Sequence, residues 1–185
     1  MTNSPFMRYL LCFLTVLLIS PLFAQVVRKE NLTKKQSTFW DAQQKQVQSS
    51  GSFYKDELDE TNDKHGEWLY YDRLGNLEEE RNYYRGKLLG KVCTFYPGKK
   101  PKNEGYFYLD IQDSIYREWN DLGNLLVEGL YDIGDPIGEW KYFYPNGKTK
   151  SIESIENDTN KIISFWLNDS LNTQTITNGT GLMTT

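Results

Sequence analysis

Aromatic and apolar residues recur along this chain at a fixed spacing of 24 residues, and this spacing is the first sign of its architecture. Each copy holds two short runs rich in Tyr, Trp and Phe, separated by glycine-containing turns. Such residues favour strands, and glycine favours tight reversals. The repeated positions form these columns: Trp68, Val92, Tyr116 and Trp140; Tyr71, Phe95, Trp119 and Phe143; Tyr83, Phe107, Tyr131 and Ile155; Gly66, Gly90 and Gly138.

The 24-residue unit reads as a β-hairpin. A strand of about six residues, such as EWLYYD at 67–72, is followed by a turn, RLGN at 73–76, and a second strand, LEEERNYY at 77–84. A linking turn, RGKLLG at 85–90 or IGDPIG at 133–138, then leads to the next unit. The pattern therefore predicts successive hairpins joined side by side.

The repeated unit predicts an all-β fold, an elongated single-layer antiparallel sheet of stacked hairpins. Residues 38–179 are expected to form about five to six hairpins, of which the terminal ones are degenerate, as is usual where a repeat array ends. Residues 25–37 read as a flexible leader and 180–185 as a frayed tail. The chain shows no helical periodicity long enough for a second layer.

The first 24 residues have the composition of a secretory signal peptide. Arg8 is their one charged residue, residues 9–20 are almost entirely apolar, and Ala24 precedes Gln25. An uncleaved N-terminal anchor is the alternative. The sequence thus predicts a secreted or periplasmic protein, with no transmembrane anchor after cleavage.

The net charge and the cysteine content limit the kinds of function and of stabilisation that the chain can have. Without the signal peptide the formal net charge moves from −4 to −5, which argues against nucleic-acid binding. Cys93 is then the remaining cysteine, so the fold has no internal disulfide. Its column contains Leu69, Arg117 and Lys141, which predicts a half-exposed strand thiol.

Two segments carry a family resemblance. HGEWLYYDRLGNLEEERNYYRGKLLG, residues 65–90, and IGEWKYFYPNGKTKSIES, residues 137–154, resemble the MORN-repeat variant family. The resemblance implies a single-layer β array that serves as a protein- or lipid-binding scaffold without catalysis. Some bacterial members are filed as antitoxins, a cytosolic role that an exported chain does not readily fill. The copies depart from the family pattern at Ser114, Asp110 and Asp158, which stand where glycine is expected.

A weaker resemblance suggests an alternative function. The segment GEWLYYDRLG, residues 66–75, is similar to the aromatic repeats of choline- or glucan-binding cell-wall modules. Those modules place tryptophan in both strands of the hairpin, whereas the second strands here contain none. A carbohydrate- or choline-binding module that uses aromatic stacking is therefore the second hypothesis.

The candidate binding residues are aromatic. Side chains two positions apart share a face of a strand, so Trp68 and Tyr70 lie together, and Trp140 and Tyr142 repeat them. The simplest interpretation of these aromatic columns is a structural core; the functional one is an exposed strip that binds a protein partner, an envelope component, a lipid headgroup or a glycan.

No catalytic, metal or cofactor site is expected. Glu80, Glu104 and Glu128 form a column that reads as a solvated charged edge rather than a cation ladder. His65, the one histidine, is expected at the surface of a turn, and no catalytic set assembles around it. The sequence therefore predicts a non-enzymatic scaffold for an unknown protein or envelope partner.

Cleavage of the signal peptide is testable directly. Signal peptidase should cut between Ala24 and Gln25, because a small residue there follows the apolar run. N-terminal sequencing and intact mass of the exported protein should then show a chain of 161 residues that begins at Gln25. A mature chain that begins at Met1 would show that the segment is not removed.

Overall fold

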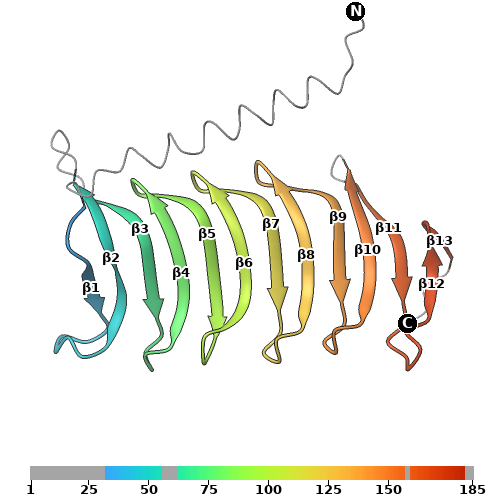
Figure 1. Ribbon diagram of the computed structural model, residues 1–185, viewed down its shortest axis with the longest axis horizontal. Coiled ribbons are helices and arrows are strands. Elements are labelled where there is room, and N and C mark those ends of the chain that lie inside the picture. The colour runs from blue at the N-terminus through green and yellow to red at the C-terminus, as the bar shows by residue number, and fades with distance from the viewer. Residues whose placement is uncertain (1–31, 56–61, 157–158, 182–185) are drawn as a thin grey trace, which may run out of the picture.

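The computed structural model describes residues 32–55, 62–156 and 159–181, which form one open sheet of thirteen strands. Strands that follow one another in the chain are neighbours in the sheet, and each such pair is antiparallel, without a crossover. Figure 1 shows the strands side by side in chain order along one elongated layer. The strands are β1 (Gln36–Phe39), β2 (Val47–Lys55), β3 (Asn62–Tyr71), β4 (Leu77–Tyr84), β5 (Lys87–Tyr96), β6 (Lys100–Tyr108), β7 (Ile111–Trp119), β8 (Leu125–Asp132), β9 (Asp135–Phe143), β10 (Thr149–Glu156), β11 (Thr159–Trp166), β12 (Gln174–Thr177) and β13 (Thr180–Gly181).

This architecture confirms the predicted all-β single-layer sheet, and the described residues contain no helix. The first strands of the hairpins are longer than the predicted six residues, at nine to ten residues for β3, β5, β7 and β9, whereas β4 has the predicted bounds of 77–84. The reason lies in the links: only residues 85–86 turn, and 87–90 already belong to β5. Residues 62–66, which precede the predicted strand at 67–72, likewise belong to β3.

The ends of the array also differ from the sequence prediction. Residues 36–37 of the expected leader belong to β1, and Leu32 forms a bridge with Tyr54. Thr180 and Gly181 of the expected frayed tail pair with β12 as β13. The predicted signal peptide at 1–24 lies outside the described residues. Both outer strands are short, which limits the unpaired backbone that an edge offers to other chains.

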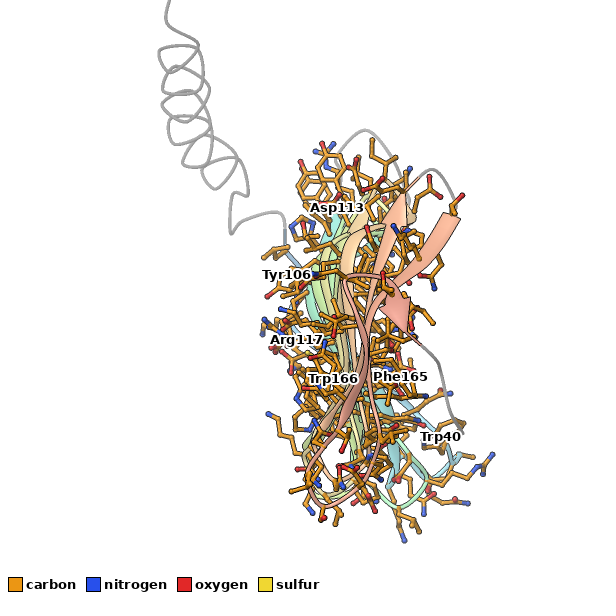
Figure 2. All side chains as sticks on the ribbon, turned by 90° about the vertical axis from the view of Figure 1, so that its right-hand side faces the viewer. Trp40, Tyr106, Asp113, Arg117, Phe165 and Trp166 are labelled. Atoms are coloured by element: carbon orange, nitrogen blue, oxygen red, sulfur yellow. The ribbon has the colours of Figure 1, made fainter. Side chains whose placement is uncertain are left out.

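Two unbroken rows of cross-strand neighbours define the two faces of the sheet. We call the face that carries Trp68 the aromatic face and the opposite one the charged face. Figure 2 looks along the array and shows Arg117 and Tyr106 on one side of the layer and Phe165 on the other. The aromatic-face row is Thr38, Ser49, Tyr70, Glu79, Thr94, Asn103, Glu118, Val127, Tyr142, Ser151, Phe165 and Ile176. The charged-face row is Ser50, Leu69, Glu80, Cys93, Glu104, Arg117, Glu128, Lys141, Ile152 and Ser164.

The single layer buries few side chains. Among the described residues, the buried apolar ones are Trp68, Cys93, Trp140, Phe165 and Ile176. Buried serines accompany them, because small residues in the row leave room for large neighbours: Ser49 pairs with Tyr70 and Ser151 with Tyr142. Stability therefore rests on cross-strand pairs and backbone hydrogen bonds rather than on a deep core.

A positive φ recurs at the position where each unit starts, whether or not glycine is present. Gly66, Gly90 and Gly138 have φ values of 70°, 98° and 68°, and Ser114 in the same column has 65°. Asp110 takes the link-glycine position with φ 75°, and its Oδ1 accepts a hydrogen bond from the Leu88 N–H at 2.7 Å. Asp110 and Ser114, which stand where the family pattern has glycine, therefore adopt the positive φ that the repeat geometry requires, although residues with a side chain disfavour it.

The strain at Ser114 predicts a stabilising substitution. A left-handed conformation costs about 1–2 kcal/mol for an L-residue other than glycine, so Ser114→Gly should raise the free energy of unfolding by about 0.5–1 kcal/mol after the unfolded chain gains freedom. Urea unfolding measures the change. Ser154→Gly, at a β10 position outside the positive-φ set, is the control and should lower stability. A loss of stability in Ser114→Gly would contradict the assignment of strain.

Candidate functional site

Two tryptophans lie flat against glycines of the preceding strand. A Cβ atom added to Gly51 would come within 2.3 Å of the Trp68 ring, and one added to Gly129 within 2.2 Å of the Trp140 ring. No larger residue fits at either glycine, so each indole packs directly on the backbone. The exposed fraction is 2% for Trp68 and 5% for Trp140. Both tryptophans are therefore part of the core.

The four predicted binding residues lie on the aromatic face, as their spacing predicted. Tyr70 and Tyr142 belong to its central row, and each contacts the tryptophan two residues before it. The tyrosines are half-buried, whereas the tryptophans are covered. A ligand on this face would therefore meet the tyrosines first, and the binding role of the four residues stays a prediction.

The first tryptophan belongs to a group of side chains that we call the upstream cluster: Phe53, Trp68, Tyr70 and Tyr83, with Lys64 and Arg81. The Lys64 ammonium lies 4.7 Å from the ring centroid of Trp68, 5.1 Å from that of Tyr70 and 5.5 Å from that of Tyr83. It also donates a hydrogen bond to the Tyr70 hydroxyl at 2.9 Å. The Arg81 guanidinium lies 4.9 Å from the Tyr70 ring centroid. Two cations of the chain thus occupy this cluster.

The second tryptophan belongs to what we call the downstream cluster: Tyr116, Tyr131, Trp140 and Tyr142. Tyr131 meets Trp140 edge-on at 5.3 Å between centroids, and Tyr116 and Tyr142 flank the indole at 6.3 and 6.4 Å with nearly parallel rings. Burial and the neighbouring Glu118 carboxylate raise the pKa of Tyr116 to about 12. Burial, followed by Glu153, also raises the pKa of Tyr142.

The glutamate column lies in the middle of the charged face, so its prediction as a sheet edge is wrong. Arg117 stands between Glu104 and Glu128 in the row and bonds both, at 3.1 and 2.7 Å, while Lys91 bonds Glu104 at 2.7 Å. Burial disfavours the charged form of Glu104, but hydrogen bonds from Lys91 and Arg117 outweigh it and lower its pKa. This row is therefore an ion-paired cross-strand ladder.

His65 is buried, contrary to the surface position predicted for it. It lies in β3, 6% exposed, between the rings of Tyr54 and Tyr84 at 5.5 and 5.3 Å, and its Nδ1 accepts the Arg85 N–H at 3.3 Å. Because β3 begins at Asn62, ahead of the predicted strand at 67–72, the residue falls within a strand and not in a turn. Burial, then the charge of Arg85, lowers its pKa.

Cys93 is also buried, and the prediction of a half-exposed thiol is wrong. Its exposed fraction is 7%, and Glu80 and Glu104 are its cross-strand neighbours on either side in the charged-face row. Burial raises the pKa of the thiol. Low exposure and a raised pKa both make the thiol a poor partner for an intermolecular disulfide.

Sequence reasoning missed the cations of the upstream cluster. Lys64 and Arg81 join it through pairings with β2 and β3, which require the register across strands. The 24-residue column that contains Tyr83 and Tyr131 could have indicated the clusters from sequence, because Tyr83 belongs to the upstream cluster and Tyr131 to the downstream cluster.

Within the described ranges, no three His, Cys, Asp or Glu side chains gather in a way that could hold a metal ion. The part of the chain that the structure describes also has no helix of the length and hydrophobicity needed to span a membrane.

The fold and the two clusters define a repeat protein built from a single layer of β-hairpins. The family model of the MORN repeat variant matches residues 64–83 and 136–157, in agreement with the resemblance seen in the sequence. The two matches contain Trp68 and Trp140. Repeats of this family are in general protein- or membrane-binding modules and not enzymes.

Comparison with other proteins adds little. No match was found among curated proteins. One similar solved structure is a mutant of S. aureus TarM in complex with fondaparinux, alpha-GlcNAc-glycerol and UDP, with 14% identity and a TM-score of 0.36. The similarity covers 52% of this chain and 19% of that one, and it is too weak to bear on function.

Acid should destabilise the fold through His65. Because its pKa is lower in the folded state than its ordinary value of 6.5, the unfolded chain takes up a proton first as the pH falls. The contribution of neutral His65 is complete well above its ordinary pKa of 6.5 and declines as the pH falls through that value toward the lower pKa of the folded state. His65→Gln should flatten this part of the profile of unfolding free energy against pH, measured by urea unfolding. An unchanged slope would show that His65 does not cause it.

Proposed function

We propose that the protein is an exported, non-enzymatic scaffold whose aromatic face binds a protein partner. One observation carries this proposal: the sheet is a single layer, and no other described element covers either of its faces (Figures 1 and 2). The aromatic face lines up half-buried tyrosines over several hairpins. Tyrosine anchors on rigid backbone are typical of protein interfaces.

The position of the tryptophans favours a protein over a glycan. Sugar stacking needs an open aromatic face, whereas Trp68 and Trp140 lie on Gly51 and Gly129 and are almost fully covered. The accessible rings are tyrosines bordered by charged residues such as Glu118 and Glu153. A polar rim around aromatic anchors suits a partner with its own polar groups.

Export is part of the proposal and rests on the N-terminal sequence. The charged start, apolar run and small residue at Ala24 favour a secreted or periplasmic chain. The non-enzymatic role is supported by the general character of the repeat family. A binding surface on an exported scaffold places the partner in the envelope or outside the cell.

Affinity capture from the native envelope fraction tests the proposal. The bait is the mature protein, compared with the double variant Tyr70→Ala/Tyr142→Ala on the aromatic face. The matched control is Leu69→Ala/Lys141→Ala, which changes the neighbouring residues in the same two strands on the charged face. Wild type and control should recover the same protein, and the aromatic-face variant should recover at least tenfold less at a temperature where all three are folded. Equal recovery by both variants would overturn the assignment of the face.

A further inference from the structure

The two clusters are equivalent positions of the repeat, so each serves as a reference for the other. Trp140 and Tyr142 follow Trp68 and Tyr70 by 72 residues, which is three repeat lengths. Tyr131 meets Trp140 edge-on from the preceding strand, as Phe53 meets Trp68. Where the two clusters differ, the cause is therefore the residues of each copy, because the backbone arrangement is the same.

The upstream cluster shows what such a group of rings can hold. Its occupant is an alkylammonium, the Lys64 side chain, which lies over three rings and donates to a tyrosine hydroxyl. The negative faces of Trp and Tyr rings attract a cation placed within about 6 Å of the centroid. The chain satisfies this cluster from within.

The downstream cluster keeps the tryptophan–tyrosine pair and an edge-on ring, has Ile155 in place of Tyr83 and gains Tyr116, but it lacks these cations. Lys64 pairs with Phe53, whereas Pro136 pairs with Tyr131 in the equivalent place. Arg81 pairs with Trp68, whereas Glu153 pairs with Trp140. Among the residues that the structure describes, no Lys or Arg lies over a ring of the downstream cluster.

Two carboxylates lie beside the downstream rings, and one of them, Glu153, stands where Arg81 stands in the upstream cluster. Glu118 accepts a hydrogen bond from the Tyr116 hydroxyl at 3.4 Å, and Glu153 is the cross-strand neighbour of Trp140. Burial is the main cause of the raised pKa values of Tyr116 and Tyr142, and the carboxylates of Glu118 and Glu153 raise them further, since negative charge disfavours a phenolate. Rings and carboxylates together favour a cation from outside.

An unpaired donor gives an independent sign that the downstream cluster is incomplete. Trp68 Nε1 donates to the Ser52 carbonyl oxygen at 2.9 Å. Trp140 Nε1 is buried in a side chain that is 5% exposed, and it has no hydrogen-bond partner among the residues that the structure describes. A buried N–H without an acceptor is destabilising, so the hydrogen-bonding capacity of the downstream cluster is less completely satisfied than that of the upstream one.

We propose that the cluster of Tyr116, Tyr131, Trp140 and Tyr142, with Glu118 and Glu153, binds a lysine side chain of the protein partner. This inference rests on the proposed function, because it assigns the lysine to that partner. A primary ammonium suits the site better than a quaternary one, since it donates hydrogen bonds to carboxylate and hydroxyl oxygens as Lys64 does to Tyr70.

Titration of the full mature protein with acetyl-Gly-Lys-Gly-amide tests the site. The readout is the indole N–H resonance of Trp140, assigned by its loss in Trp140→Phe. We expect a saturable shift, and at least tenfold weaker binding of the neutral peptide acetyl-Gly-norleucine-Gly-amide. Choline, which keeps the positive charge but has no N–H donor, should also bind more weakly than the lysine peptide.

Three variants locate the site on the protein. Pro136→Lys/Glu153→Arg gives the downstream cluster the cations of the upstream one and should weaken binding of the lysine peptide at least tenfold. The matched control is Ile137→Lys/Glu139→Arg, which makes the same change in charge on the opposite face and should bind as wild type does. Glu153→Gln keeps the shape of the cluster and should weaken binding severalfold. The Trp68 indole resonance reports that each variant is folded.

Several results would overturn the inference: no saturable shift with the lysine peptide, equal binding of the norleucine peptide, tighter binding of choline, or equal losses in the two double variants. These outcomes are separate from the capture experiment with Tyr70→Ala/Tyr142→Ala. If a partner is still captured through the aromatic face, only the lysine site fails. If the lysine peptide binds and no partner is captured, the proposed function fails instead.

Discussion

Continuous antiparallel pairing between neighbouring strands is the interaction on which this molecule depends. A single layer has no second sheet or helix to pack against, so each strand gains its stability from the strand on either side. Pairing in register places like positions of the 24-residue unit next to one another, and side chains then form rows that cross the array. The same constraint explains why a positive φ recurs at Ser114 although no glycine is there.

The repeat makes the scaffold, and the differences between copies make the candidate site. A tryptophan packs on a glycine of the preceding strand in two copies, at Trp68 and at Trp140, and each contacts a tyrosine two residues further on. Around the first copy the chain places Lys64; around the second it places Pro136. One cluster is thereby completed from within, and the other offers rings and carboxylates to a partner. The ion-paired row on the charged face has no such contrast, since Arg117 satisfies the glutamates on both sides.

The sequence predicts the repeat, the strand faces and the family, because all three depend on spacing along the chain. Trp68 and Tyr70 share a face in any strand, whatever its neighbours. The burial of Cys93 and His65 could not be predicted in the same way, because residues of adjacent strands cover them. The place of Gly51 under Trp68 was hidden too, since the longer link between β2 and β3 breaks the 24-residue phase.

Native-state hydrogen exchange tests the central claim, that this is a one-layer array held by pairing between neighbours. In such an array a strand opens most easily where it has few strands beyond it. The account predicts the slowest exchange for paired amides in the middle, from β5 to β8, and progressively faster exchange toward β1 and β13. Equal protection of paired amides from β2 to β12 would contradict it, because uniform protection indicates one cooperative core that the structure does not have.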